Sequence, residues 1–249
     1  MKLSLATHQI DVWLINLDDP KWDTCRGVLS KDEALLAMRF LASNVRDQRA
    51  RCKASIRMIL SEYLTSRPAE IEILADPCGK PCAAGASIHF NISHSGSFAL
   101  IAVSGVPVGV DMEHLSATCS ASEELINFIC SGLEADALKS LTPTARKRAF
   151  YRLWTKKESY CKAIGTGIAR NLAMLHLSTG PGCLTERITD TAQMTPPYYI
   201  HELALLDDYM GCVCTPSPGA VVQLLDTRAT GPRNLRNCRN YPLSMATRS

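Results

Sequence analysis

The sequence lacks any uninterrupted apolar run of the length that a membrane-spanning helix requires. The residues from Met1 to Gln9 also lack the apolar core of a secretory signal peptide. We therefore expect a cytoplasmic protein that does not bind membranes. The sequence also lacks a large excess of positive or negative charge, because its net charge is only +3. An excess this small permits an anionic ligand but does not point to nucleic acid as a partner.

Paired cysteines and zinc-finger spacing are also missing. The eleven cysteines are scattered along the chain, and free thiols in a reducing compartment are the better interpretation. Cys212 and Cys214 are separated by a single residue, which is the wrong spacing for a zinc knuckle, and no matching histidine or cysteine pair lies nearby in the sequence. We expect no structural zinc site.

With 249 residues, the chain can form one large domain or two smaller ones. Predicted strands and helices follow one another without a repeating βαβ rhythm, which favours an α+β fold. A capping box at Ser30 to Glu33 predicts a helix that runs to about Ala42. A second helix is predicted from about Val45 to Leu64, with Asn44 as its cap. The basic residues 227–249 contain few large apolar side chains, and we predict a mobile tail there.

The chain from Val108 to Met112 is predicted to be a strand, with two carboxylates at its end. Side chains two residues apart on a strand point to the same side, so Asp111 and Glu113 project together while Met112 points away. Two like charges this close are costly unless a cation or a shared proton joins them. Paired hard oxygen ligands suit Mg²⁺, which leaves further positions for water and substrate phosphate.

A long helix is predicted from about Thr144 to Ile164, and it carries charged residues on or beside its apolar face. Lys157 falls within the apolar stripe, Glu158 at its margin, and Lys162 one turn further on. One interpretation is a snorkelling Lys157 beside a surface pair of Glu158 and Lys162. The other is a functional site, which is favoured by a third segment upstream, Phe90-Asn-Ile-Ser-His-Ser-Gly96.

Four segments together resemble the 4′-phosphopantetheinyl transferases, specifically their larger, Sfp-like branch. The segments occur in the family's order and spacing, and four such motifs in order make a chance match implausible. They are Gly79-Lys80-Pro81, Phe90–Gly96, Gly109-Val-Asp-Met-Glu113 and Trp154–Gly165.

The resemblance implies a monomer built from two similar halves related by a pseudo-twofold axis, with the active site between them. We place an N-terminal half at residues 1–105 and a C-terminal half at residues 106–226. It also implies an enzyme that transfers the 4′-phosphopantetheine group of coenzyme A to a serine hydroxyl of an apo acyl or peptidyl carrier protein. Adenosine 3′,5′-bisphosphate is released. No motif marks a surface that would choose among fatty-acid, polyketide, nonribosomal-peptide and siderophore carriers.

The resemblance also suggests roles for individual residues. Asp111, Glu113 and Glu158 would hold Mg²⁺, and Glu158 is also a candidate base for the serine proton. Whether Glu158 serves as ligand, base or both stays open. The resemblance further implies six residues that contact the phosphate groups of coenzyme A: Lys80, Ser93, His94, Lys162 and, at the 3′-phosphate, Arg49 and Lys53 of the basic helix described next. Of these, His94 and Lys162 would stabilise the charge that develops during transfer.

The predicted helix from Val45 to Leu64 carries a row of four cations beside its apolar face. Neighbouring cations repel each other unless water or an anion screens them. Any one of them is explained by a solvated helix face, but four in register favour one wall of a polyanion site. Arg49 and Lys53 are the candidates for the 3′-phosphate of coenzyme A. The row consists of Arg46, Arg49, Lys53 and Arg57.

Three alternative functions are also compatible with parts of the sequence. A non-catalytic module that binds coenzyme A or a carrier protein would explain the cations but not the complete carboxylate set. A nucleic-acid-binding protein would need interleaved aromatic residues or a known binding motif, and neither is present. Another Mg²⁺-dependent phosphoryl-transfer hydrolase, such as a phosphatase or nuclease, is the closest enzymatic alternative. It would consume coenzyme A without an apo carrier protein.

Overall fold

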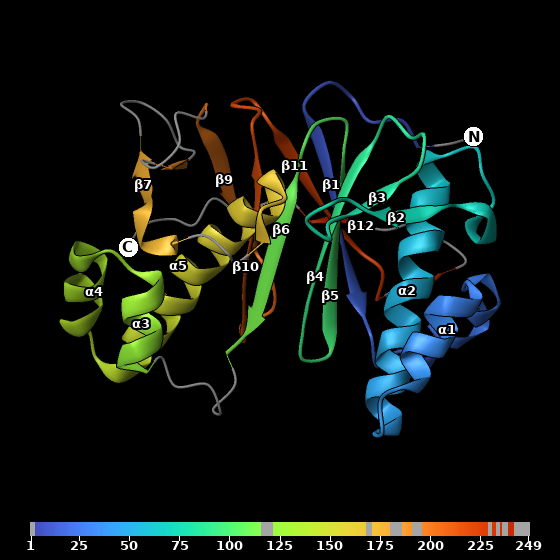
Figure 1. Cartoon of the computed structure of the whole chain (residues 1–249), viewed down its shortest axis with the longest axis horizontal. Coiled ribbons are helices and arrows are strands. Elements are labelled where there is room, and N and C mark those ends of the chain that lie inside the picture. Colours follow the sequence, from blue (N-terminus) through green and yellow to red (C-terminus); the bar gives the residue numbers. More distant parts are fainter. Residues whose placement is uncertain are drawn as a thin grey trace.

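The computed structural model describes residues 3–115, 122–167, 171–179, 186–190, 196–228, 231–232, 235 and 239–241. Two five-stranded sheets and two long helices dominate the fold, so the predicted α+β class is confirmed. The sheets stand next to each other in the middle of the molecule, and the helices cover their outer sides (Figure 1). The predicted pseudo-twofold relation between the halves stays a prediction.

The first part of the chain forms the helices and strands on the right of Figure 1. Its long helix, α2, has 21 residues and begins one residue before Asn44, the predicted cap. The residue at the cap position is instead Ala42, whose side chain makes no capping hydrogen bond. The elements are β1 (Gln9–Asn16), η1 (Pro20–Val28), α1 (Lys31–Met38), α2 (Ser43–Tyr63), η2 (Pro68–Glu70), β2 (Ile73–Ala75), β3 (Pro81–Ala83), β4 (His89–Ser95) and β5 (Phe98–Ser104).

The second part forms the left of the same view, except for β11 and β12, which lie with the first sheet. Its long helix, α5, has 22 residues; Pro143 lies in its first turn and Gly165 ends it in the left-handed conformation. The elements are β6 (Gly109–His114), α3 (Glu123–Ile129), α4 (Gly132–Lys139), α5 (Pro143–Ile164), η4 (Leu172–Met174), β7 (Leu175–Thr179), β8 (Glu186–Asp190), β9 (Tyr198–Glu202), β10 (Tyr209–Thr215), β11 (Val221–Asp226) and β12 (Arg239–Tyr241).

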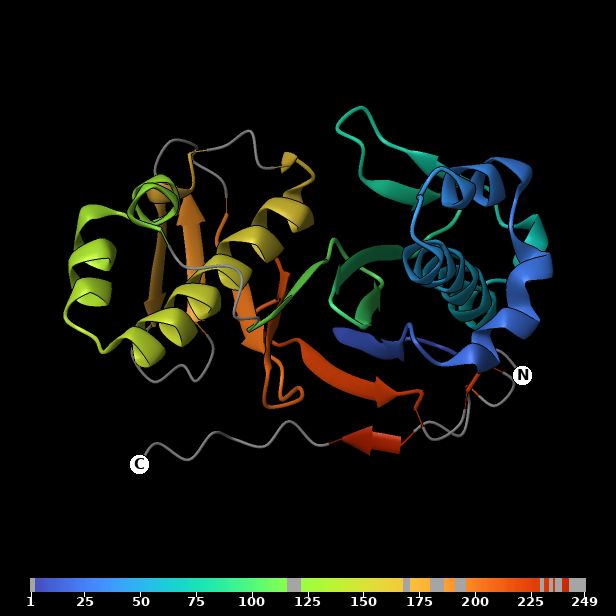
Figure 2. The same cartoon turned by 90° about the horizontal axis from the view of Figure 1, so that it is seen from below.

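The first sheet takes strands from both ends of the chain. Its order is β12-β11-β1-β5-β4, with β11 parallel to β1. The predicted boundary near residue 105 falls in the loop between β5 and β6, but the N-terminal half also includes β11 and β12. We predicted a mobile tail at residues 227–249, whereas the described part of this segment packs against the first half. Leu235 is buried in the core of the first half, and Arg239–Tyr241 pairs with β11, seen beside β11 in Figure 2.

The second sheet has the order β6-β10-β9-β8-β7. Three apolar clusters hold the layers together: one between α2 and the first sheet, one between the second sheet and α3, α4 and α5, and one between the two sheets. Strand β6 contributes Val110 and Met112 to the cluster between the sheets. By strand alternation, Asp111 and Glu113 point to the other side, as predicted, toward α5. The packing thus presents both carboxylates to the helix that carries Glu158.

Gly109 allows α5 to lie directly on β6. A Cβ atom at this position would lie 2.0 Å from the carbonyl oxygen of Ser159 and 2.3 Å from the backbone nitrogen of Ala163. Both atoms belong to the backbone of α5, so any other residue would push the helix away. The glycine before the carboxylates therefore sets the separation between Glu158 and Asp111.

Two charged residues near the predicted site support the fold instead. Lys157 is fully buried, and its ammonium donates to the carbonyl of Ile129 at 2.9 Å and to Glu134 at 2.7 Å. It is therefore a buried ion pair that ties α5 to α4, and not a snorkelling side chain. Arg57 is also buried: it bonds Glu33 and two backbone carbonyls where the start of α1 and η2 cover that part of α2. Arg57 is thus excluded from the predicted row of exposed cations.

Candidate active site

Residues from β4, β6 and α5 meet between the two halves. Lys162 lies at the centre of the group: its ammonium donates to Asp111 Oδ1 at 2.7 Å and to Ser93 Oγ at 3.0 Å. Glu158, one turn earlier on α5, is 5% exposed, and Asp111 is 3% exposed. The structure therefore brings together Ser93, Asp111, Glu113, Glu158 and Lys162, and Glu158 and Lys162 do not form the surface pair of the alternative interpretation.

Burial makes the ionised form of all three carboxyl groups costly. It is the largest cause of the raised pKa of Asp111, Glu113 and Glu158. For Glu158, the nearby charges of Asp111 and Glu113 also raise the pKa and the Lys162 ammonium lowers it, and the balance of these effects is a pKa of about 7. The site therefore holds more negative charge than its one ammonium group offsets.

The carboxylates fit a divalent cation in chemistry, although they are not arranged as a finished metal site. Within the described ranges, no cluster of three or more histidine, cysteine, aspartate or glutamate side chains is placed to hold a metal ion, and Lys162 occupies one oxygen of Asp111. The other oxygen, Asp111 Oδ2, and Glu158 Oε1 are buried without a hydrogen-bond partner among the described residues. Two buried carboxylate oxygens without partners, next to the further carboxylate of Glu113, are a donor set that suits Mg²⁺.

The second half of β4 sends alternate side chains to two different sites. Ser93 and Ser95 face β6, while His94 faces α2, where Arg49 Nη1 contacts His94 Nε2. A guanidinium group can only donate, so His94 accepts in this contact and is neutral. Burial, and then the Arg49 charge, lower the pKa of His94. His94 itself lies in strand β4, and the turn follows at Gly96.

The predicted coenzyme A residues fall into two groups. Arg49 and Lys53 lie on α2 beside His94, and both positive charges act on that imidazole. The Arg49 guanidinium also lies 5.2 Å from the centre of the Phe40 ring. Lys80 lies apart from them: its ammonium donates to the carbonyls of Val108 at 3.0 Å and Ala163 at 2.9 Å. In this structure Lys80 therefore connects β3 to the second half, a role that the sequence did not suggest.

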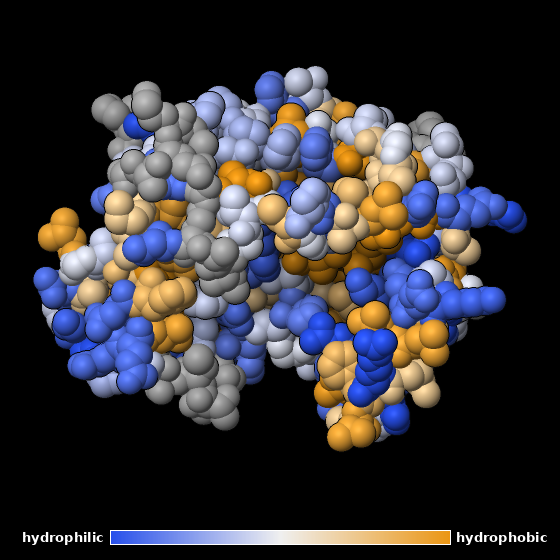
Figure 3. All heavy atoms as spheres, in the orientation of Figure 1, coloured by the Kyte–Doolittle hydropathy of each residue, from blue (hydrophilic) through white to orange (hydrophobic). Residues whose placement is uncertain are grey.

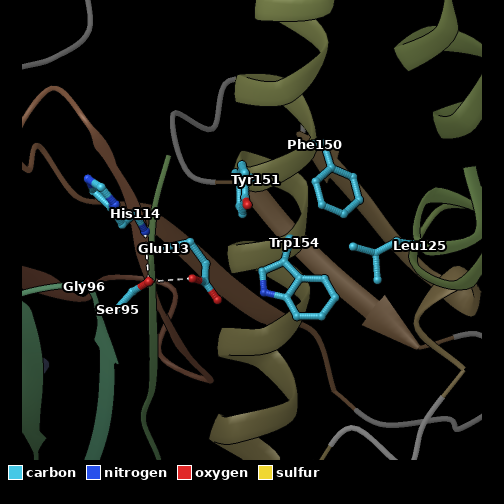
Figure 4. A pocket seen from close by; sticks show the side chains of 8 residues that line it. All are labelled: Ser95, Gly96, Glu113, His114, Leu125, Phe150, Tyr151 and Trp154. Carbon is cyan, nitrogen blue, oxygen red and sulfur yellow. Dashed lines mark hydrogen bonds between the residues drawn. The ribbon is translucent and has the colours of Figure 1, made fainter. Parts of the chain in front are cut away.

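A cavity of about 350 Å³ opens beside Glu113 (Figure 4). Glu113 stands on one wall, with Ser95 bonded to it, and the aromatic side chains of α5 form the opposite wall. Figure 3 shows a recess between the two halves at the bottom of the view. The four-residue spacing of Phe150 and Trp154 indicates that they share a helix face, but it did not predict that they line a cavity. The lining residues are Ser95, Gly96, Glu113, His114, Leu125, Phe150, Tyr151 and Trp154.

Comparisons with known proteins agree with this geometry. Residues 107–214, which include β6 and α5, match the family model of the 4′-phosphopantetheinyl transferase superfamily. The chain is 34% identical over 175 residues to 4′-phosphopantetheinyl transferase HetI of Nostoc sp. (strain PCC 7120 / SAG 25.82 / UTEX 2576). The matched region covers 68% of this chain and 73% of that protein. The chain belongs to the 4′-phosphopantetheinyl transferase superfamily.

Similarity to other family members extends over more of the chain. The match to 4′-phosphopantetheinyl transferase Sfp of Bacillus subtilis (strain 168) is 27% identical over 223 residues, 88% of this chain and 90% of that protein. The match to 4′-phosphopantetheinyl transferase gsp of Aneurinibacillus migulanus is 30% identical over 206 residues, 76% of this chain and 83% of that protein. The predicted family and its enzyme class, a 4′-phosphopantetheinyl transferase, are thereby confirmed. None of the helices described here has the length and apolar character needed to cross a membrane.

Proposed function

We propose that this transferase moves the 4′-phosphopantetheine group of coenzyme A to a serine hydroxyl of an apo carrier protein, with Asp111, Glu113 and Glu158 holding Mg²⁺. The observation that carries this proposal is the convergence of two buried carboxylates, the half-buried Glu113 and Lys162 at one point, beside an apolar cavity. We further propose that the protein acts as a cytoplasmic monomer. Its described cysteines are all free thiols, which suits a reducing compartment.

In the proposed reaction, the serine oxygen forms a bond to the phosphorus of the phosphopantetheine phosphate. The bond from that phosphorus to the bridging pyrophosphate oxygen breaks, and adenosine 3′,5′-bisphosphate leaves. Mg²⁺, when bound, would neutralise charge on the pyrophosphate oxygens. The serine proton goes to Glu158, directly or through a water molecule. A pKa of about 7 lets this carboxylate accept a proton near neutral pH.

Two basic groups would bind the remaining negative charge. The Lys162 ammonium already lies at Asp111, and we propose that it turns toward the phosphates when Mg²⁺ takes its place. Arg49 and Lys53 lie on α2 next to His94, where they would hold the 3′-phosphate. Lys80 retains a third donor beyond its two carbonyl contacts, Ser93 bonds Lys162, and His94 is exposed beside Arg49, so all three stay candidates for coenzyme A contacts.

The experiment that tests the function separates it from a hydrolase. The protein is incubated with coenzyme A and Mg²⁺, with and without an apo carrier protein, and adenosine 3′,5′-bisphosphate is measured by liquid chromatography. We expect release only when the carrier is present. Equal release without the carrier would identify a hydrolase, and no release with any apo carrier in the presence of bound coenzyme A would favour a binding module.

Arg49 and Lys53 provide a prediction about binding. The 3′-phosphate is remote from the bond that breaks, so the variants Arg49→Gln and Lys53→Met should weaken coenzyme A by about 10-fold or more each, with little effect on 3′-dephospho-coenzyme A. Calorimetry with both ligands measures this difference. Arg67→Gln, which removes an exposed cation elsewhere, is the control. Equal losses for both ligands would show that the α2 cations do not bind the 3′-phosphate.

The raised pKa of Glu158 predicts how Mg²⁺ affects stability at different pH. The folded protein holds this proton more tightly than the unfolded chain does, since its pKa rises from 4.5 to about 7. Stability is therefore lost as the pH rises through this window. Mg²⁺ would offset that loss, so its effect on the melting temperature should be small near pH 5 and large near pH 8. A Mg²⁺ effect that does not vary with pH, measured by scanning fluorimetry, would argue against this site.

A further inference from the structure

The seam between the two sheets is closed by side chains. Strand β4 is the edge of the first sheet, and β6 is the edge of the second. Side-chain oxygens of alternate residues of β4 accept hydrogen bonds from the backbone N–H groups of alternate residues of β6. The N–H of Val110 donates to Asn91 Oδ1 at 2.9 Å, that of Met112 to Ser93 Oγ at 3.3 Å, and that of His114 to Ser95 Oγ at 3.0 Å.

The two serines of this seam have a second contact that Asn91 does not share. A hydroxyl group has one proton to donate. Because its oxygen accepts a hydrogen bond from an N–H of β6, that proton is free to be donated to another acceptor. Ser93 donates its proton to Asp111 Oδ1 at 2.8 Å, and Ser95 donates to Glu113 Oε2 at 2.7 Å. Each serine thus connects the backbone of β6 to a carboxylate of the same strand.

We propose that Ser95 is a positioning residue that holds the Glu113 carboxylate in the orientation that binds the metal. This inference rests on the proposed function. Figure 4 shows Ser95 between the backbone of His114 and the carboxylate of Glu113, at the edge of the cavity. Glu113 is only half-buried, and its flexible side chain has open space on the cavity side. The hydroxyl of Ser95, together with the Trp154 side chain that also bonds Glu113, favours one orientation of this carboxylate before metal or substrate binds.

Ser95 is chosen over Ser93 because its contacts are simpler. Ser93 also accepts the Lys162 ammonium and is itself a candidate for binding coenzyme A. Replacing it would change several interactions at once. Among the residues that the structure describes, the Ser95 hydroxyl bonds only the His114 N–H and the Glu113 carboxylate, so its replacement reports on Glu113.

The test compares three variants of Ser95 in the full-length protein. Ser95→Ala removes the donor, Ser95→Cys keeps the volume with a weaker donor, and Ser95→Thr keeps the hydroxyl. Mg²⁺ affinity is measured by calorimetry, and coenzyme A affinity is measured without metal. We expect Ser95→Ala to weaken Mg²⁺ by about 10- to 100-fold, with coenzyme A affinity changed less than about twofold, Ser95→Cys to be intermediate, and Ser95→Thr to approach the wild type.

Two controls separate positioning from a loss of structure. Ser61→Ala removes a buried hydroxyl from α2, away from the carboxylates, and should leave Mg²⁺ affinity unchanged. In a Glu113→Gln background, Ser95→Ala should cost little further Mg²⁺ affinity, because both changes remove the same interaction. Ser95→Cys provides the same comparison if Ser95→Ala does not fold.

The outcomes distinguish this inference from the proposed function. Wild-type Mg²⁺ affinity in Ser95→Ala, or an equal loss in the Glu113→Gln background, would overturn the role of Ser95 while leaving the proposed function intact. A wild-type protein that neither binds Mg²⁺ nor modifies a carrier would overturn the proposed function itself.

Discussion

Glu158→Gln should reduce transfer to the carrier by about 10³-fold or more while the protein still folds and binds coenzyme A. The change keeps the shape of the side chain and one oxygen ligand but removes the charge and the basicity, and general base catalysis alone typically contributes 10²–10⁴-fold. The fold should tolerate it, because burial already disfavours the ionised carboxylate and raises its pKa to about 7. Formation of the modified carrier is measured by mass spectrometry.

A Mg²⁺ titration of the same variant separates the two roles of Glu158. If the carboxylate acts as both ligand and base, added Mg²⁺ should restore little of the rate. Recovery to nearly the wild-type rate at high Mg²⁺ would exclude the base role. Glu72→Gln, an exposed carboxylate on the first half, is the matched control and should behave like the wild type. Transfer at the wild-type rate in Glu158→Gln without added metal would remove Glu158 from the site.

Gly109→Ala should destabilise the protein strongly, although the substitution adds a single methyl group. That methyl would lie 2.0 Å from the Ser159 carbonyl oxygen and 2.3 Å from the Ala163 nitrogen, which is far inside van der Waals contact. Since both are backbone atoms, α5 must move away from β6. We expect the free energy of unfolding to fall by about 3 kcal/mol or more, at the upper end of the cost of overpacking.

The same shift should also reduce catalysis, because α5 carries Glu158 and Lys162. A displacement of about 1 Å can cost ~10²-fold in rate. Urea denaturation measures the stability, and the transfer assay measures the rate in the fraction that remains folded. Gly105→Ala is the control: a Cβ atom there meets nothing within 4 Å. A Gly109→Ala variant that is as stable and active as Gly105→Ala would contradict the proposed close packing of α5 on β6.

Local patterns predicted much of the candidate site. The alternation of a strand placed Asp111 and Glu113 on one side and Met112 on the other. Helical spacing, with a proline in the first turn and a glycine at the end, predicted α5 as Thr144 to Ile164, and the structure has Pro143–Ile164. These features depend on neighbours in sequence, so the sequence contains the information that specifies them.

Features that depend on distant partners were missed or misread. Lys157 is buried because Glu134, 23 residues earlier, supplies its counter-ion, and Arg57 is buried because Glu33 does the same. Helical spacing shows that these cations share a face but not what covers that face. The return of β11 to pair with β1 joins opposite ends of the chain, and strand pattern does not specify such a partner. The contact of Lys80 with two carbonyls of the second half has the same cause.

The mass of an apo carrier protein after incubation with the enzyme, coenzyme A and Mg²⁺ tests the central claim most directly. The account predicts that the carrier gains one phosphopantetheine group on its serine, that a carrier with alanine at that serine gains nothing, and that Asp111→Ala does not modify the carrier. An unchanged mass for every apo carrier supplied, with an enzyme shown to be folded and to bind coenzyme A, would contradict it. So would full modification by Asp111→Ala with Mg²⁺ as the only divalent ion.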